Sequence, residues 1–289
     1  MESKIVSDSI SHHQIRLKHD NDFFTLTDRY YSSGLYLTYT SSLKKGIGKG
    51  QEQLSFTIGQ EVYTPFNIIT TNIEEQDRPY VGFLGLKTGW SSVKNKHSWD
   101  ASLLVGIAGN NSGAGGFQRW YHKIFVVSDP PVWVDEMDNS LHANGYVGYL
   151  KEWTLAPNPF SITLAVQPSL AFGTRDQFAQ ANFIAYFGRR DPLASTMAYQ
   201  RIGNTRREIF FSLRAGYRYV GYNALLEGNA LGDNSIFLIS PNREFVFGGF
   251  DVQHRFKKNE YWFGYRIQSP EATGTQSHKY VILSYARNF

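Results

Sequence analysis

Two segments of the sequence carry side chains that could do acid–base chemistry. Residues 21–39 read NDFFTLTDRYYSSGLYLTY and bring an amide, carboxylates, tyrosines and serines into one cluster. Residues 110–125 read NNSGAGGFQRWYHKIF, in which Gln118 and His122 are spaced i and i+4 and therefore share one face of an expected helix. A lone loop histidine is more often an ordinary surface residue. The carboxamide one helical turn away is the reason to consider a functional role as well.

The elements that must hold these clusters are β-strands. Apolar and polar residues alternate along residues 209–219, so that Ile209 and Phe211 share one face while Ser212 and Arg214 share the other. The same pattern recurs in about twelve segments, near 14–24, 33–43, 52–63, 78–92, 97–109, 141–154, 160–172, 179–189, 208–222, 243–256, 260–269 and 278–289. A helical period is found at residues 116–127 instead.

The length of these segments distinguishes a membrane barrel from a soluble sandwich or barrel. Most of them reach the roughly 9–11 residues that a transmembrane strand needs, against about 5–6 in soluble sheets. Aromatic residues gather at segment ends, as a membrane girdle requires, and the chain ends in Phe289, which resembles the signature of bacterial outer-membrane proteins. The sequence therefore predicts an all-β fold in the bacterial outer membrane: a transmembrane antiparallel β-barrel of about twelve strands, with a short helix in an extracellular loop.

The composition agrees with this fold class and argues against others. The 289 residues include no Cys, so the chain has neither a disulfide framework nor a thiolate metal site. The net charge of +4 comes from scattered Lys and Arg, which argues against nucleic-acid binding. The longest apolar stretches are far shorter than the roughly 20 residues of a transmembrane helix. We expect a single barrel domain over residues 1–289, monomeric, with a flexible tail at residues 1–13.

Both termini are expected at the periplasmic end, which places the polar clusters at the extracellular end. The connections at 64–77, 110–140 and 223–241 are long, as extracellular loops are, but 190–207 is long where a short periplasmic turn is expected. Strand periodicity puts Asn21 and Asp22 on opposite faces, and both reach one site only if the strand bulges or ends there. Asn21 is expected on the outward face with Leu17, and Asp22 on the face of Arg16 and Lys18.

These motifs resemble one known family, the outer-membrane lipid A 3'-O-deacylases of LpxR type. The resemblance rests on NDFFTLTDRYYSSGL at the start of the chain, on GNNSGAGGFQRWYHKI with PPVW downstream, and on three shorter motifs, GQEVYTP, DRPYVGF and LEGN. Each motif alone is weak, but their order and spacing together are specific, and they run through most of the chain. The resemblance implies a twelve-stranded barrel, in agreement with the independent count of segments.

The resemblance also implies an activity and its residues. The family hydrolyses the 3'-linked acyloxyacyl ester of lipid A, the membrane anchor of lipopolysaccharide, and depends on Ca²⁺. Matched motif to motif, the family's catalytic histidine falls on His122, its neighbouring glutamine on Gln118 and its essential hydroxyl on Ser32. Its Asn-Asp pair falls on Asn21 and Asp22, which we expect to hold Ca²⁺.

The expected mechanism follows from what ester hydrolysis requires. His122 would activate a water, while Ca²⁺ held by oxygen ligands would polarise the ester carbonyl. Ser32 would orient water or substrate, and direct attack by Ser32 is the less favoured variant. We expect Tyr31 and Arg78 to contact the substrate.

Two departures from the family pattern leave alternatives open. Ser128 stands where a family glutamate follows the histidine, and a lysine expected after Pro65 is missing. A catalytically silent barrel that acts as a scaffold or assembly partner is therefore one alternative. A narrow porin is another, because inward-facing side chains such as Arg16, Lys18 and Arg214 could line an aqueous channel.

Overall fold

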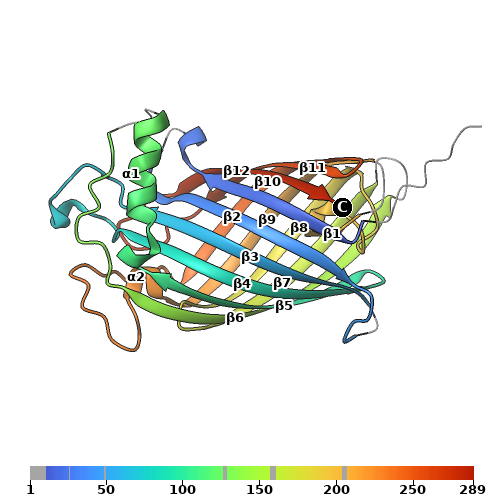
Figure 1. Cartoon of the computed structure of the whole chain (residues 1–289), viewed down its shortest axis with the longest axis horizontal. Coiled ribbons are helices and arrows are strands. Elements are labelled where there is room, and N and C mark those ends of the chain that lie inside the picture. The colour runs from blue at the N-terminus through green and yellow to red at the C-terminus, as the bar shows by residue number, and fades with distance from the viewer. Residues whose placement is uncertain (1–10, 26, 49, 126–128, 157–160, 204–206) are drawn as a thin grey trace, which may run out of the picture.

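Neighbouring segments pair with one another and close into a barrel (Figure 1). The computed structural model describes residues 11–25, 27–48, 50–125, 129–156, 161–203 and 207–289. Each strand pairs antiparallel with the next along the chain, and the first pairs with the last. The strands are β1 (His13–Asn21), β2 (Tyr30–Leu43), β3 (Gln51–Thr64), β4 (Val81–Lys94), β5 (His97–Ala108), β6 (Ser140–Ala156), β7 (Ile162–Gly173), β8 (Asp176–Arg189), β9 (Arg207–Asn223), β10 (Glu244–Phe256), β11 (Asn259–Gln268) and β12 (His278–Asn288). The predicted twelve-stranded barrel is confirmed.

Helical segments in the described residues lie in the connections. The α-helices are α1 (Ala114–Phe125) and α2 (Ala224–Glu227), and the single 3-10 turns are η1 (Phe23–Thr25), η2 (Ile73–Glu75), η3 (Asn110–Ser112) and η4 (Met197–Tyr199). The helix predicted over 116–127 is found as α1, which begins two residues earlier; residues 126 and 127 lie outside the described residues. None of the helices in the described ranges is long and apolar enough to cross a membrane.

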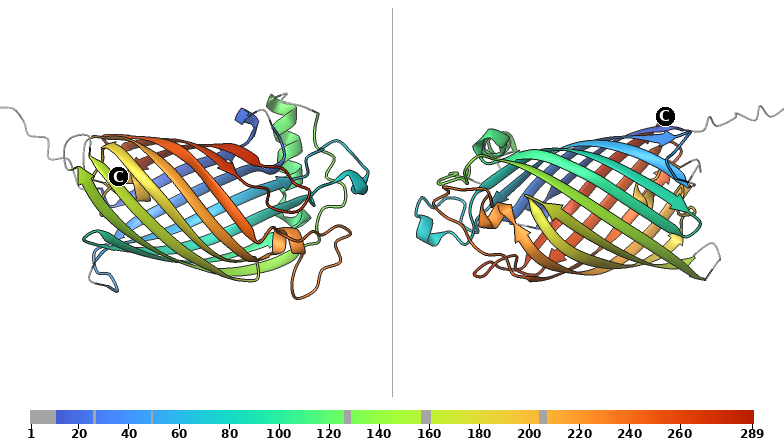
Figure 2. Two further views of the ribbon diagram at one scale, coloured as in Figure 1. Left: turned by 180° about the vertical axis from the view of Figure 1, so that it is seen from behind. Right: turned by 90° about the horizontal axis from the view of Figure 1, so that it is seen from below.

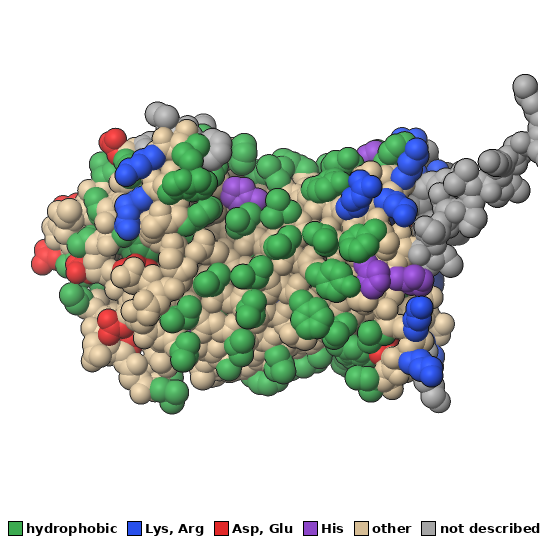
Figure 3. Space-filling model, viewed as in Figure 1, with side chains coloured by type: hydrophobic (Ala, Val, Ile, Leu, Met, Phe, Trp, Pro, Cys, Tyr) green, Lys and Arg blue, Asp and Glu red, His purple; other side chains and the backbone are tan. Residues whose placement is uncertain are grey.

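The two faces of each strand differ in their surroundings. On β1, Ile15 and Leu17 point outward and are about half exposed, whereas Gln14 and Arg16 point inward and are buried. Figure 3 shows hydrophobic side chains over the middle of the barrel wall and Lys and Arg side chains toward its two ends. A hydrophobic outer band around a polar interior is the arrangement of a membrane barrel.

The two ends of the barrel carry different connections. The described chain termini lie together at one end, where the backbone amides of His12 and His13 both donate to the carbonyl oxygen of Phe289 at 3.0 Å. His13 begins β1 and therefore does not belong to the predicted tail, of which residues 1–10 lie outside the described residues. The opposite end carries α1, α2 and the long loops (Figure 2). Long loops are extracellular in such barrels, so the end with the termini is periplasmic.

The long periplasmic connection folds back into the lumen. Residues 191–203, which we call the plug, place Met197 against the inward-facing Ile184, Tyr186 and Phe210. On the other side of the lumen, Arg201 of the plug donates to Ser91 Oγ at 2.6 Å and to the carbonyl oxygen of Gln51 at 2.7 Å. The plug thus reaches strands on opposite sides of the barrel, which explains why this connection is long where a short turn is expected.

A buried ion network fixes the plug to the barrel wall. Arg255 of β10 lies 2.6 Å from Glu208 Oε2 and 2.8 Å from Glu260 Oε1, and all three side chains are 0% exposed. Its guanidinium also donates to the carbonyl oxygens of Ser195 and Arg201, both at 2.8 Å. Because buried charges are tolerated only when paired and hydrogen-bonded, this network makes the plug part of the folded barrel.

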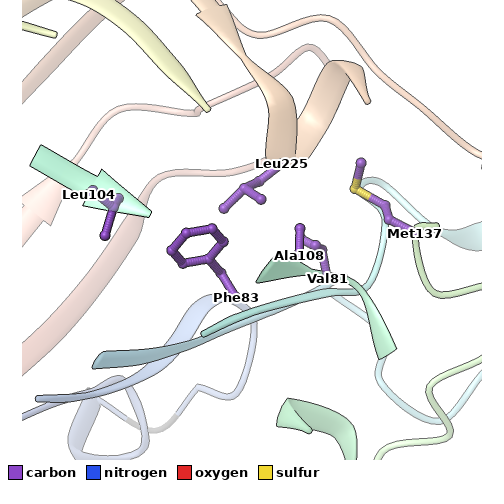
Figure 4. Close-up of a cluster of buried hydrophobic side chains, with 6 residues drawn as sticks. All are labelled: Val81, Phe83, Leu104, Ala108, Met137 and Leu225. Atoms are coloured by element: carbon purple, nitrogen blue, oxygen red, sulfur yellow. The ribbon is translucent and has the colours of Figure 1, made fainter. Parts of the chain in front are cut away.

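Above the plug, the lumen contains a cavity of about 650 Å³ lined by polar and aromatic side chains. At its extracellular end a hydrophobic cluster joins α2 to the wall (Figure 4). Phe83, Leu104 and Leu225 belong to this cluster and also line the cavity, whereas Val81, Ala108 and Met137 complete the cluster. The cluster supports the extracellular rim on which the polar residues of interest lie.

Candidate functional site

A β-bulge in β2 decides which face Ser32 occupies. The pairing of β2 with β3 runs Tyr31 to Tyr63 and then Ser33 to Val62, so Ser32 is the extra, unpaired residue. Strict alternation would turn Ser32 inward together with Tyr36, but the bulge leaves both Ser32 and Ser33 on the outer wall.

The end of β1 brings Asn21 and Asp22 to the same place. Asn21 is the last residue of the strand and pairs with Ser33, while the amide of Asp22 donates to the carbonyl oxygen of Ser32 at 3.2 Å. The carbonyl oxygen of Asp22 then accepts from Thr25 as the chain turns into η1. Because alternation stops with the strand, Asn21 and Asp22 both line the cavity described below. The expected condition, a strand that ends at this point, is met.

Helix α1 lies across the outer wall of the barrel and supplies the other half of the site. It packs at its first residue, Ala114, against Val62 of β3. A Cβ atom on Gly82 of β4 would lie only 2.1 Å from Ser112 Oγ and 2.3 Å from Ala114 Cβ, so this close approach requires glycine. The packing of the helix start on β3 and β4 directs the buried face of α1 toward β2 and β1.

His122 and Gln118 project from that face into a hydrogen-bonded cluster. His122 Nε2 lies 3.0 Å from Asp28 Oδ2, and both His122 and Gln118 are 4% exposed. Gln118 Nε2 donates to Asp28 Oδ1 at 3.1 Å and to Ser32 Oγ at 3.2 Å. Trp133 Nε1 donates to Gln118 Oε1 at 2.8 Å, which turns the amide nitrogen of Gln118 toward Asp28 and Ser32. The histidine, the amide and the hydroxyl are therefore held around one carboxylate.

A cavity of about 20 Å³ lies at the centre of this cluster. That volume accommodates about one water molecule. Polar side chains on its wall are Asn21, Asp22, Asp28, Ser32, Ser33, Gln118 and His122, and apolar ones are Phe23, Val62, Phe117 and Tyr121. The cavity lies between α1 and the outer wall rather than in the lumen, so it is on the lipid side of the barrel.

The carboxylates of Asp22 and Asp28 lie close together in this site, and the ion pair given for Asp28 within the described residues is with a histidine rather than with Lys or Arg. Burial raises the pKa of Asp22 well above its usual value, and the nearby Asp28 carboxylate raises it further. Hydrogen bonds from the Arg29 amide and the Thr27 hydroxyl to Asp22 Oδ2 act in the opposite direction. A bound cation would relieve the repulsion between these carboxylates.

The oxygen donors at this site fit a hard cation, although few of them are carboxylates. Among the described residues, no three His, Cys, Asp or Glu side chains form a group that could hold a metal ion by themselves. The buried Asp28 Oδ2 lies 3.0 Å from His122 Nε2 and takes no other hydrogen bond within that part of the chain. Ca²⁺ takes carboxylate, amide, hydroxyl and water oxygens, so Asp22 and Asp28 with neutral oxygens from Asn21 and Ser32 would suit it.

Two residues expected to contact the substrate lie elsewhere. Tyr31 points into the lumen, where its hydroxyl donates to Asp20 Oδ2 at 2.8 Å. Arg78 is 0% exposed, forms an ion pair with Glu271 and places its guanidinium 4.7 Å from the centre of the Tyr63 ring. Neither side chain reaches the cavity beside His122, and their assignment as substrate contacts stays a prediction.

The structure adds Asp28 and Trp133 to the cluster. Sequence reasoning missed Asp28 because nothing local distinguishes it from a solvated turn residue, although it lies only four positions before Ser32. Trp133 belongs to the PPVW motif, which was noted for its resemblance alone and whose contact with Gln118 depends on a loop returning over α1. Ser128, which stands where the family has a glutamate, lies outside the described residues.

The sequence is similar to a known family, and the fold is similar to that of solved structures. A family model described as outer membrane protein LpxR matches residues 3–289. No curated protein sequence gave a significant match. The fold is similar to that of LpxR from Salmonella typhimurium, with a TM-score of 0.78 and 17% identity over 96% of this chain and 100% of that one. The β domain of the Bordetella autotransporter BrkA aligns with a TM-score of 0.49 and 11% identity over 97% of this chain and 100% of that one.

Proposed function

Because the chain belongs to the LpxR family of outer membrane proteins, we propose that it is a lipid A 3'-O-deacylase. In this proposal it is a Ca²⁺-dependent ester hydrolase that removes the 3'-linked acyloxyacyl chain in the outer leaflet. The observation that carries the proposal is the grouping of His122, Gln118 and Ser32 around Asp28 on the outer wall of the barrel. A lipid in the outer leaflet lies beside that wall and can reach it without entering the lumen.

The contacts of His122 support its role as general base. Its Nε2 faces the Asp28 carboxylate, and we assign the other ring nitrogen, Nδ1, to take a proton from water. The carboxylate fixes the tautomer of the ring and stabilises the imidazolium that forms when the water proton is taken. The water then attacks the ester carbonyl carbon, and the imidazolium returns the proton to the departing alkoxide as the ester bond breaks.

Ser32 supplies a donor for the negative charge that develops on the carbonyl oxygen. Its Oγ accepts from Gln118 Nε2 at 3.2 Å, so its own proton remains to donate, and it borders the cavity. Gln118, oriented by Trp133, positions this hydroxyl, and a preorganised donor stabilises the tetrahedral intermediate. When bound by Asp22 and Asp28, Ca²⁺ would add a positive charge that polarises the ester carbonyl. Attack by serine would need the Ser32 hydroxyl to donate to His122. Ser32 Oγ instead lies against Gln118 Nε2, and His122 Nε2 faces Asp28, which favours the water mechanism.

The test is mass spectrometry of lipid A from outer membranes with and without the protein. We expect lipid A to lose the mass of the 3'-linked acyloxyacyl group when the protein is present, and purified protein to lose this activity in chelator and regain it with Ca²⁺ more than with Mg²⁺. Unchanged lipid A with correctly folded barrel in the membrane would favour the silent scaffold. Activity that persists in excess chelator would remove Ca²⁺ from the mechanism.

A narrow porin has less support than a hydrolase. The plug crosses the periplasmic end of the lumen, and Gln200 of the plug lines the floor of the lumen cavity. Arg214, which could have lined a channel, is paired with Asp251 at 2.5 Å. We expect the barrel to give no ion conductance in planar bilayers, and stable channel currents would reverse this preference.

A further inference from the structure

Helix α1 lies in the plane that the membrane surface would occupy. In Figure 1 its axis is upright while the barrel axis is horizontal, and in the right-hand view of Figure 2, turned by 90°, the helix is seen almost end-on. The helix is therefore roughly perpendicular to the barrel axis and lies at the extracellular end of the wall. A helix in this position runs along the boundary between acyl chains and head groups.

One flank of α1 is apolar and faces the bilayer side. Trp120 and Ile124 are both 53% exposed, and the ring centre of Phe117 lies 5.8 Å from that of Trp120. Tyr121, on the same flank, lies with its ring centre 6.5 Å from that of His19, which is on the outward face of β1 two residues before the strand ends. This contact shows that the apolar flank of α1 continues the lipid-facing surface of the barrel.

The other flank of α1 carries two cations. Arg119 and Lys123 are spaced i and i+4, so they lie one above the other on the helix surface, and both are exposed. Neither forms an ion pair within the part of the chain that the structure describes, although Arg119 acts electrostatically on the loop residue Glu136. At 100° per residue these cations lie on the side of α1 away from Tyr121 and its contact with His19. Figure 3 shows Lys and Arg side chains over α1 beside hydrophobic ones.

We propose that α1 is an interfacial docking helix on which Arg119 and Lys123 bind the phosphate of an outer-leaflet lipid while Trp120 and Ile124 contact its acyl chains. The proposal rests on the proposed function for the identity of the lipid, which is lipid A. It has two supports in the molecule: the apolar flank is continuous with the lipid-facing wall, and the cationic flank is complementary to an anionic head group. Residues Gln118 and His122 lie on the buried face of the same helix, so a lipid docked on α1 lies next to the cavity.

The experiment measures binding of lipid A in the inactive His122→Ala background, so that no hydrolysis occurs. Native mass spectrometry of the detergent-solubilised barrel counts bound lipid A at increasing lipid concentration. Each cation near an anionic lipid surface is expected to change the dissociation constant about fivefold, and Arg119→Gln with Lys123→Gln about thirtyfold. The loss should shrink in high salt, because screening weakens exposed charge interactions.

Two comparisons make the result specific. Lys44→Gln with Lys45→Gln removes an equally exposed cation pair from a periplasmic turn and should leave binding unchanged. Arg119→Lys with Lys123→Arg keeps the charge and should retain binding, which shows that the helix tolerates substitution. Lipid A stripped of its phosphates should bind the parent and the Gln variants equally.

Equal binding of phosphorylated lipid A by the parent and by the Arg119→Gln, Lys123→Gln variant would overturn the proposal. Equal loss of binding for phosphorylated and stripped lipid A would also overturn it, because a phosphate contact predicts a difference. A barrel with wild-type His122 that binds lipid A through these cations but releases no acyl chain would instead contradict the proposed hydrolysis and leave the docking helix in place.

Discussion

Both ends of the barrel contain buried or largely buried carboxylates, but the partners of these carboxylates differ. Glu208 and Glu260 lie at the periplasmic end, and Asp22 and Asp28 lie at the extracellular end. Glu208 and Glu260 both pair with Arg255 at 2.6–2.8 Å, and Glu260 also lies 2.6 Å from Arg16. Glu208 accepts two further hydrogen bonds from plug amides. Both glutamates therefore pair directly with an arginine, whose positive charge is permanent.

At the extracellular end, the ion pair that the structure gives for Asp28 is with His122, and none is given for Asp22 within the described ranges. The burial of Asp22 and its neighbour Asp28 act in the same direction and favour the protonated carboxyl. Matched charges hold the plug in the barrel, whereas the unmatched pair leaves capacity for a proton or a cation. The difference separates a network that serves the fold from a cluster suited to chemistry.

The largest expected effect is loss of activity at the extracellular end with no loss of stability. His122→Ala should lower deacylation about 10²–10⁴-fold, because it removes the proposed base. The folded barrel should survive, since His122 lies on α1, outside the strand pairing that closes the barrel. Release of the 3'-linked acyl chains by mass spectrometry measures the effect. His12→Ala, near the chain terminus, is the control and should be fully active; near-wild-type release by His122→Ala would refute the histidine mechanism.

The opposite pattern is expected at the periplasmic end. Arg255→Met leaves Glu208 and Glu260 buried with part of their positive charge removed, which should lower the free energy of unfolding by about 3–5 kcal/mol. Urea unfolding in detergent measures this, and the activity of the folded fraction should be unchanged. Arg243→Met is the matched control, because its pair with Glu227 is exposed and contributes at most about 1 kcal/mol. A stable Arg255→Met barrel would remove the distinction between the two ends.

A substitution in the Asp22 and Asp28 pair should either stabilise the Ca²⁺-free barrel or leave its stability unchanged. Asp22→Asn removes the repulsion between Asp22 and Asp28, so the melting temperature without Ca²⁺ should not fall. Ca²⁺ at a hundredfold excess over its dissociation constant should stabilise the wild-type barrel by about 2.7 kcal/mol, and this increment should disappear in the variant. Thermal unfolding with Ca²⁺, Mg²⁺ or chelator measures it. An Asp22→Asn barrel that still gains the full increment would exclude Asp22 as a ligand.

The smallest effect concerns the loop beside α1. Burial raises the pKa of Glu136 to about 7, with a backbone hydrogen bond and Arg119 opposing the shift. Between the ordinary carboxyl pKa and about 7, the unfolded loop loses a proton that the folded loop keeps, so local stability should fall as pH rises through this window. The protection factors of residues 134–139, which correct hydrogen-exchange rates for the intrinsic effect of pH, should fall over that range. Glu136→Gln should remove this pH dependence, and an unchanged profile in the variant would assign it to another group.

The sequence determined most of the fold by itself. Alternation over about twelve long segments is a local property of strands that face lipid on one side, and the strands lie where it predicted them. The i, i+4 spacing of Gln118 and His122 likewise placed both on one face of α1, because helical geometry depends on nothing outside the helix. The family resemblance pointed to Ser32 as the essential hydroxyl residue, and the structure brings Ser32 Oγ to 3.2 Å from Gln118 Nε2.

The tertiary structure decided what local periodicity could not. Alternation turns Ser32 into the lumen, and only the pairing of β2 with β3 creates the bulge that keeps it on the outer wall. Asp28 became part of the site because α1 returns over the first hairpin from about 90 residues further along the chain. The sequence showed the plug only as an unexpectedly long turn. Its contacts with Arg255 and the partners of Arg255 hold it across the periplasmic end of the lumen. In each case the deciding contact joins segments distant in sequence, and a pattern within one segment carries no information about such contacts.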